Sequence, residues 1–264
     1  MKALAARRRH PLALVVLIAL GLLVTGAGYT VFAPRPATAS TEAGGDADRG
    51  RELFLANCST CHGMQAQGTR NAPTLIGVGA AAVDFQVGTG RMPLAATAPQ
   101  APDREDIEFT EQDVADLSAY VASLAPGPAI PDGEYLEPLL DDDEAIAEGG
   151  ELFRVNCAMC HNVAGAGGAL TRGKTAPALT GVEPVHIYEA MVTGPQSMPV
   201  FNDANITPEQ KQNIISYLKY IENEPAPGGL SLGSIGPVSE GLFAWLVGLG
   251  ALIGCAVWLG AKSS

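Results

Sequence analysis

The sequence predicts an all-α chain in which two copies of one small helical domain lie between an N-terminal and a C-terminal transmembrane helix. Two observations predict this fold class. An uncharged apolar stretch stands near each end of the chain, and blocks of sequence recur in the same order in both halves. The chain has 264 residues, which is enough for two small domains and their connections.

The apolar ends have the length of membrane spans. Residues 11–33 carry no charge, and neither do residues 242–261. A helix needs about 20 apolar residues to cross the hydrocarbon core. The first stretch resembles a signal peptide with a cleavage site at 37–39, but it is longer than the usual apolar core of about 7–15 residues. We therefore expect a retained anchor at the N-terminus and a true span at the C-terminus.

The distribution of charge predicts the orientation. Arg7, Arg8 and Arg9 precede the first span and Lys262 follows the second, and positive residues mark the cytoplasmic side. The long segment between the spans is acidic, in a chain of net charge -12. We place this segment outside the cytoplasm, in an oxidising compartment. Its acidity makes nucleic acid an unsuitable partner.

A motif of the form N-C-x-x-C-H occurs once in each copy. Its cysteines and histidines are Cys58, Cys61, His62, Cys157, Cys160 and His161. A redox-active dithiol would require a thioredoxin-like βαβ setting, which is not visible, and a four-ligand zinc site would have to join the two halves. The third chemistry is covalent attachment of haem c. The fifth cysteine, Cys255, lies in the C-terminal span, where we expect a small apolar filler.

Haem attachment explains the spacing of the motif. Residues i, i+3 and i+4 share one face of a helical turn. Two thiols on that face can bond the two vinyl groups at one edge of a porphyrin, while the histidine reaches the iron. We expect a covalently bound haem c in each copy, two in all. The haem would add apolar surface to a domain of about 80 residues, which is small for a core of its own.

The repeat extends well beyond the motif. The aligned segments are 50–62 with 149–161, 72–78 with 176–182, 89–93 with 193–199, and 109–124 with 206–221. Each copy is expected to begin and end with a helix. Thr110 is the N-cap candidate of the closing helix in the first copy, and Thr207 precedes that of the second. The residues expected in the two cores are Phe54, Val114, Leu117, Tyr120, Val121, Leu124, Phe153, Ile214, Ile215, Tyr217, Leu218 and Ile221.

Elimination points to the second axial ligand of the first haem. Between Cys61 and Cys157 the chain has no lysine and no histidine besides His62. Met64 is too close to that histidine to reach the opposite haem face. Met92, which stands before a proline in a glycine-rich stretch, is therefore the expected ligand.

The second copy leaves more alternatives, namely Lys174, His186, Met191 and Met198. Met198 is favoured because it matches Met92 in position. Met191 is expected in the core of a helix, and His186 at the surface or as a cap near its start. We further expect each motif histidine to donate its other ring N–H to a backbone carbonyl near Pro73 or Pro177.

Histidine–methionine ligation favours electron transfer. A filled sixth position raises the reduction potential and leaves no open site for a substrate. A dihaem peroxidase would need one open or displaceable position, so the matching methionines argue against it. A purely structural or zinc-binding module is a weaker alternative still.

The arrangement of a basic N-terminus, a span, two class I cytochrome c domains and a second span resembles the dihaem cytochrome c subunit of the actinobacterial cytochrome bcc complex. That complex is a menaquinol-oxidising counterpart of the mitochondrial bc complex. The resemblance covers nearly the whole chain. The C-x-x-C-H motif is common to many cytochromes, so the order span–haem–haem–span is the more selective feature.

The resemblance implies a role and partners. In this family the subunit takes electrons from the Rieske iron–sulfur protein, in a complex with cytochrome b, and passes them to the copper centre of an aa-type cytochrome c oxidase. It implies that His62 and Met92 hold the haem facing the Rieske donor, and that His161 and Met198 hold the haem facing the oxidase. The chain would be an electron carrier in a proton-motive translocase of the cell membrane.

The alternative is a dihaem cytochrome c subunit of another membrane oxidoreductase, a cbb-type oxidase or a dehydrogenase. The cbb-type subunit ends in a haem domain, so the C-terminal span argues against it.

The predicted segments are a cytoplasmic N-terminus at 1–10, a transmembrane helix at 11–33, a linker at 34–45, a cytochrome c domain at 46–125, a solvated linker at 126–145, a second cytochrome c domain at 146–224, a linker at 225–240 and a transmembrane helix at 241–261.

Overall fold

The computed structural model describes residues 11–32, 44–94, 99–104, 106, 108–131, 133–223 and 237–261. The predicted cytoplasmic segment 1–10, Lys262 and most of the linkers 34–45 and 225–240 lie outside the described residues. The chain divides into two compact units, Met1–Thr38 and Ala39–Ser264.

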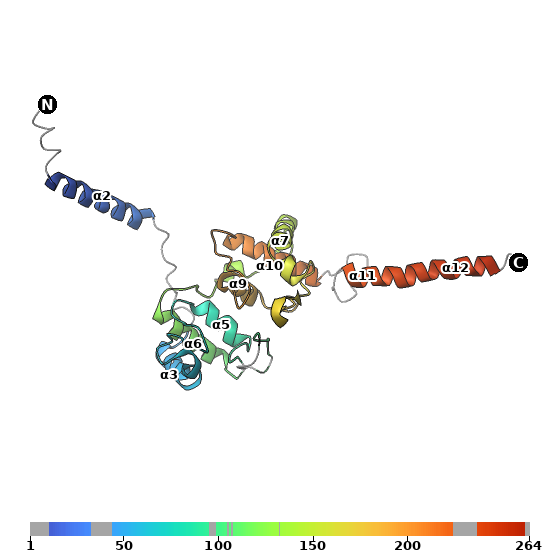
Figure 1. Cartoon of the computed structure of the whole chain (residues 1–264), viewed down its shortest axis with the longest axis horizontal. Coiled ribbons are helices and arrows are strands. Elements are labelled where there is room, and N and C mark those ends of the chain that lie inside the picture. The colour runs from blue at the N-terminus through green and yellow to red at the C-terminus, as the bar shows by residue number, and fades with distance from the viewer. Residues whose placement is uncertain are drawn as a thin grey trace, which may run out of the picture. The chain divides into compact units, whose positions relative to one another are not determined.

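The first unit contains helix α2, Pro11–Phe32 (Figure 1). It forms where an N-terminal span is expected, and its residues Leu14–Gly28 are apolar. The C-terminal end of the second unit is helical through α11 (Pro237–Phe243), a π-helical turn (Ala244–Leu249) and α12 (Gly250–Ala261). Over the described residues, Val238–Ala261 is the single helix long and apolar enough to cross a membrane, with a mean hydropathy of 2.2.

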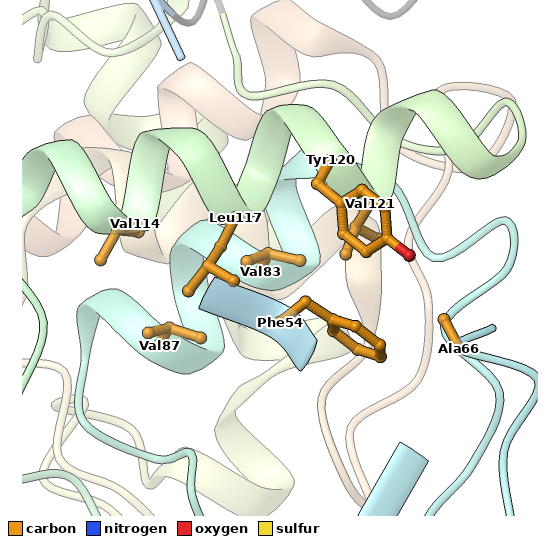
Figure 2. Close-up of a cluster of buried hydrophobic side chains, with 8 residues drawn as sticks. All are labelled: Phe54, Ala66, Val83, Val87, Val114, Leu117, Tyr120 and Val121. Atoms are coloured by element: carbon orange, nitrogen blue, oxygen red, sulfur yellow. The ribbon is translucent and has the colours of Figure 1, made fainter. Parts of the chain in front are cut away.

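Within its described residues, the first copy contains four helices. They are α3 (Ala47–Asn57), α4 (Ser59–His62), α5 (Ala80–Gly88) and α6 (Glu111–Leu124). Helices α3 and α6 pack against each other, and α5 packs against α6. Figure 2 shows the core between them, where Phe54 faces Tyr120 and the valines of α5 meet the apolar stripe of α6. The expected core residues of this copy are buried, apart from Leu124, which is half-buried at the core edge.

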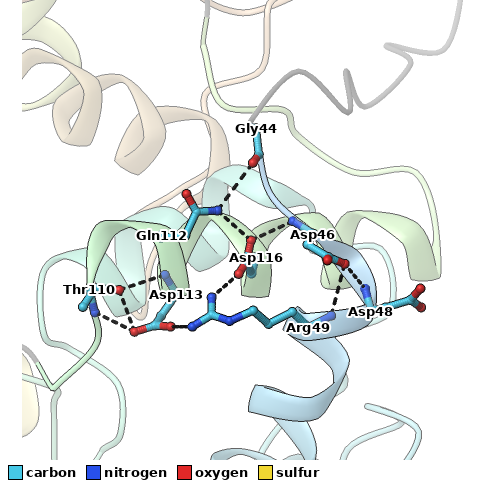
Figure 3. Close-up of polar contacts among 8 residues, drawn as sticks. All are labelled: Gly44, Asp46, Asp48, Arg49, Thr110, Gln112, Asp113 and Asp116. Atoms are coloured by element: carbon cyan, nitrogen blue, oxygen red, sulfur yellow. Dashed lines mark hydrogen bonds and ion pairs between the residues drawn. The ribbon is translucent and has the colours of Figure 1, made fainter.

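The α3–α6 crossing is close because Gly50 lies at its centre. A Cβ atom at this position would stand 1.9 Å from the carbonyl oxygen of Asp116, well inside van der Waals contact. Beside the crossing, the guanidinium of Arg49 pairs with Asp113 and with the buried carboxylate of Asp116 (Figure 3). The predicted N-cap Thr110 is confirmed, and it forms a capping box with Asp113.

The second copy repeats this plan and adds a hairpin. Its helices are α7 (Asp143–Asn156), α8 (Ala158–His161), α9 (Pro184–Thr193) and α10 (Pro208–Asn223). Strands β1 (Gly168–Ala169) and β2 (Thr175–Ala176) pair antiparallel around a 3-10 turn, Thr171–Gly173. The expected core residues Phe153, Ile214, Ile215 and Leu218 are buried, and Tyr217 and Ile221 pack at the edge.

The segment between the copies differs from the solvated linker that the sequence predicts. It includes a 3-10 turn at Gly133–Tyr135, and the side chain of Gln212 donates to the carbonyls of Glu134 and Glu137, both at 2.9 Å. The N–H of Leu139 donates to Ser216 at 2.8 Å. Backbone groups of this segment find partners on α10, so it packs along the second copy instead of crossing open solvent. Helix α7 also begins at Asp143, slightly before the expected domain boundary.

Candidate functional site

Each C-x-x-C-H motif lies where the first long helix of its copy ends and a four-residue helix begins. Cys58 is the C-cap of α3 and the N-cap of α4, and Cys157 has the same place between α7 and α8. The N–H of His62 donates to the carbonyl of Cys58 at 3.0 Å, and that of His161 to Cys157 at 2.9 Å. This single turn holds both thiols and the imidazole of each motif in one local structure.

Both motif histidines are oriented by a proline carbonyl, as the sequence predicts. The Nδ1 atom of His62 lies 2.8 Å from the oxygen of Pro73, and Nδ1 of His161 lies 3.0 Å from the oxygen of Pro177. A carbonyl only accepts hydrogen bonds, so Nδ1 must carry the proton. The lone pair of a neutral imidazole is then on Nε2, the atom that would bind a metal.

Burial favours the neutral forms of His161 and Cys157. Burial lowers the pKa of His161, although its bond to Pro177 acts in the opposite direction. Burial also raises the pKa of the Cys157 thiol to about 11. No disulfide joins any of the five cysteines. A neutral imidazole can bind haem iron, and the two thiols of the motif are the groups that form thioether bonds to haem.

An apolar cavity adjoins the second motif. Cys157, Cys160 and His161 line it from the motif, and Met191 and Met198 line it from α9 and the following loop. Apolar side chains, including Phe153, Leu179 and Leu218, form much of the remaining wall. Two thiols, a nitrogen ligand, thioether sulfurs and an apolar wall are the donor set and surroundings that a haem c requires.

The first copy places the corresponding residues against its own core. Cys58 and Met92 are half-buried and pack on the cluster around Phe54 and Leu117. The N–H of Met92 donates to the carbonyl of Gln86 at 2.8 Å, which ties its loop to α5. Met64, by contrast, is exposed. These positions are compatible with Met92 as a ligand and Met64 as a surface residue.

The alternatives in the second copy have different surroundings. Met191 is buried in the core, as expected. Lys174 reaches Ser197 at 2.9 Å. The expectation for His186 is wrong, because Glu183 occupies the N-cap position of α9 and the His186 ring is half-buried in a T-shaped contact with Phe85, with ring centroids 6.2 Å apart. His186 thus lies at a contact between the two copies.

That contact is a feature that sequence reasoning missed. Helices α5 and α9 pack together. The side chain of Gln100 accepts from the N–H of Thr175 and donates to its carbonyl, both at 2.7 Å. Phe85, Arg91 and Gln100 of the first copy line the cavity beside the second motif. No short sequence motif predicts this contact, because its two sides, α5 and α9, lie about a hundred residues apart in the chain.

Comparisons with known proteins agree with the duplicated plan. The family model "Cytochrome c" matches residues 47–125. The model "Cytochrome C oxidase, cbb3-type, subunit III" matches residues 144–218. The chain therefore contains two cytochrome c domains, one in each copy.

Whole-chain relatives extend the likeness to both ends. A protein of Corynebacterium efficiens named "Cytochrome bc1 complex cytochrome c subunit" is 42% identical over 93% of this chain and 88% of its own length. Proteins of the same name from Mycobacterium tuberculosis and Corynebacterium diphtheriae are 42% and 40% identical, over 97% and 99% of this chain. The diphtheriae protein is covered over 99% of its own length. These relatives match the chain beyond the haem domains, which the two family models do not.

Proposed function

This chain belongs to the family of cytochrome c subunits of the cytochrome bc1 complex, and we propose that it is the dihaem electron-transfer subunit of a respiratory quinol:cytochrome c reductase. One observation carries the proposal. The C-x-x-C-H motif occurs in both copies, and in both a proline carbonyl turns the histidine so that Nε2 can bind iron. Such duplication suits a relay with two redox stations better than a single reaction centre.

Eight side chains would hold two haems c. Cys58 and Cys61 would form the thioether bonds of the first haem, and Cys157 and Cys160 those of the second. The axial pairs would be His62 with Met92 and His161 with Met198. Each haem supplies one-electron redox chemistry when it is bound.

The surrounding residues favour this use. Apolar walls around the second motif exclude water and stabilise the less charged, reduced state, which raises a reduction potential. Lys174 also lines this cavity and offers positive charge to carboxylate groups of a cofactor. With the sixth position filled, the chain performs no bond chemistry of its own. The reductase and proton-translocating activities belong to the complex.

The proposed topology has two spans. Residues 11–33 and 241–261 cross the cell membrane, and the domains at 46–125 and 146–224 lie on its outer face. Linkers at 34–45, 126–145 and 225–240 separate these parts. The C-terminal helix has the required length and apolarity, and the uncharged helix α2 supports the N-terminal span.

The proposed partners are the cytochrome b and Rieske iron–sulfur subunits of the complex and an aa-type cytochrome c oxidase. The first haem would face the Rieske donor and the second the copper centre of the oxidase. The rival is a dihaem subunit of a cbb-type oxidase or a dehydrogenase, which the match at residues 144–218 brings to attention. That match covers one domain, whereas the bc1-type relatives cover both domains and both ends.

Redox titration of the tagged, membrane-extracted protein tests the ligand assignments. Met92→Ala and Met198→Ala should each lower the potential of one haem, block turnover and leave both haems attached. Met64→Ala is the matched control, because this methionine is exposed, and its potentials should stay unchanged. An unaltered potential in either ligand variant would remove that methionine from the axial set.

A reduced-minus-oxidised spectrum of the purified assembly tests the partners. Bands of b-type and a-type haem beside the c-type band support a complex with cytochrome b and an aa-type oxidase. Copurification with a cbb-type oxidase or a dehydrogenase would favour the rival assignment.

A further inference from the structure

The contact between the two cytochrome c domains contains a group of three potential metal ligands. Asp84 lies on α5 of the first domain, and His186 and Glu189 lie on α9 of the second. One ligand atom from each residue lies within 4.8 Å of the other two. His186 and Glu189 are three residues apart, so they share a face of α9. That face is turned towards α5, because the two helices pack together.

Glu189 has surroundings that call for a positive partner. Its side chain is fully buried, with 0% of its surface exposed. Neither of its carboxylate oxygens accepts a hydrogen bond from a donor group in the described part of the chain, and a bond to Asp84 requires a proton on one of the two carboxyls. A buried carboxylate without a partner is costly, so such a group normally carries a proton or binds a cation. Burial, followed by the charge and hydrogen bonding of Asp84, raises the pKa of Glu189 to about 10.

The nearby protein cations are engaged elsewhere. The guanidinium of Arg91 lies 3.5 Å from the carboxylate of Asp103 and 4.6 Å from the ring centre of Phe85. Lys211 donates to Asp203 at 2.7 Å and to the carbonyl of Ile206 at 2.6 Å. Among the described residues, neither Asp84 nor Glu189 forms an ion pair with a basic side chain. The two acids and the imidazole therefore face one another without a protein cation between them.

We propose that Asp84, His186 and Glu189 bind one divalent metal ion of the zinc class, separate from the haem irons, between the two cytochrome c domains. Carboxylate oxygens and imidazole nitrogens are both zinc ligands, and zinc sites with three protein ligands hold water in the fourth position. Calcium and magnesium prefer sites made of oxygen alone. The ion would replace the proton of Glu189 and balance both carboxylates.

The position of this site gives it a consequence for the relay. Helix α5 ends at Gly88, shortly before Met92, and α9 ends at Thr193, shortly before Met198. A metal ion bound to both helices would fix the start of the Met92 loop relative to the start of the Met198 loop. It would thereby set the separation of the two redox stations, on which electron transfer between them depends.

Zinc binding to the full chain, purified with its haems in detergent and freed of loose metal with EDTA, tests the site. After addition of zinc chloride and removal of the excess, elemental analysis should find one zinc per chain beyond the iron. In competition with a chromophoric chelator, Glu189→Gln and Asp84→Asn should each lower the zinc affinity by about 100-fold. Glu151→Gln is the matched control, because this acid is exposed on α7 and lies outside the cluster, and its affinity should be unchanged.

The outcomes separate this proposal from the haem assignments. A wild-type chain that retains no zinc, or a Glu189→Gln chain that binds zinc as well as wild type, would overturn the metal site and leave a shared proton between Glu189 and Asp84. Loss of zinc in both variants with the haem spectrum intact would support it. Because Asp84 is only half-buried, Asp84→Asn provides a second variant should Glu189→Gln disturb folding.

Discussion

Both cytochrome c domains contain the same crossing of their first and last long helices. The charged residue on the first of these helices is basic in the first domain and acidic in the second. In the first domain Arg49 of α3 pairs with Asp113 and Asp116 of α6. The aligned positions of the second domain carry Glu148 on α7, with Gln210 and Asn213 on α10. The amides of Gln210 and Asn213 donate to the Glu148 carboxylate at 3.3 and 2.8 Å. The first domain therefore has a basic residue between two acids, where the second has an acidic residue between two amides.

What stays the same is the close approach of the helices. Gly149 stands where the first domain has Gly50, and a Cβ there would lie 1.8 Å from the carbonyl of Asn213. The aromatic pairs also correspond, with ring centroids 5.2 Å apart for Phe54 and Tyr120 and 5.6 Å apart for Phe153 and Tyr217. Backbone contact and aromatic packing therefore set the geometry. Polar groups beside the crossing only need partners, so their chemistry can differ.

Substituting the crossing glycines should give the largest effect. Gly50→Ala and Gly149→Ala each force a Cβ into the facing backbone, and we expect losses above about 5 kcal/mol, comparable to the stability of a small domain. Covalent haem content and thermal unfolding measure the result. Gly133→Ala is the control, because nothing lies within 4 Å of its Cβ position. Normal folding of either crossing variant would show that the helices can move apart.

Truncating the aromatic pairs should come next. Phe54 and Phe153 are both buried, with 1% and 0% exposed, so Phe54→Ala and Phe153→Ala should each cost about 3–5 kcal/mol through lost burial and the cavity left behind. Hydrogen exchange of peptides from each domain can assign the loss. Equal destabilisation of the two domains is expected. A strongly unequal result would mean that one domain depends on other contacts for this helix pair.

Removing the basic residue Arg49 should change the pH dependence of the first domain only. Burial alone would raise the pKa of Asp116, but the N–H of Asp46 and the Arg49 guanidinium outweigh it and lower that pKa. Bonds from Thr110, followed by Arg49, lower the pKa of Asp113. Groups with a depressed folded-state pKa stabilise at neutral pH, and this stabilisation is lost as pH falls below about 4.

Arg49→Gln should therefore destabilise the first domain at neutral pH and flatten its acid-induced loss of protection. Hydrogen exchange in α3 and α6, recorded against pH, measures both effects. The control is Arg51→Gln, since Arg51 is exposed and forms no ion pair among the described residues. An unchanged pH profile in Arg49→Gln would remove the ion pairs from the account of this crossing.

The helix caps should give the smallest difference. Thr110 accepts from the N–H of Asp113 at 3.2 Å and donates to its carboxylate at 2.7 Å. Thr207 accepts from the N–H of Gln210 at 3.3 Å. Thr110→Ala should cost about 1 kcal/mol, and Thr207→Ala less, because Gln210 offers a neutral amide in place of a carboxylate. Exchange rates in the first turns of α6 and α10 test this ranking, and the reverse order would contradict it.

Local sequence patterns are sufficient to predict many features of this protein. The spacing of cysteines and histidine in each motif, the threonine before each closing helix and the apolar stripes are local patterns, and helical geometry converts them directly into positions. The role of the carbonyls of Pro73 and Pro177 could be predicted for the same reason, since they follow the motifs at short distance. For the second axial ligands, elimination reduced the candidates of the first copy to Met92, and position favoured Met198 in the second. Both assignments stay predictions.

Tertiary structure alone decided how the two domains meet. The sequence alone predicts His186 to be a surface or capping residue. Folding instead brings it and Glu189, its neighbour on α9, to Asp84 across the contact with α5. The segment between the domains reads as a solvated linker, yet its backbone groups bind α10. Neither outcome follows from periodicity, because each depends on which surfaces of two folded domains are complementary. The zinc experiment is directed at such a surface.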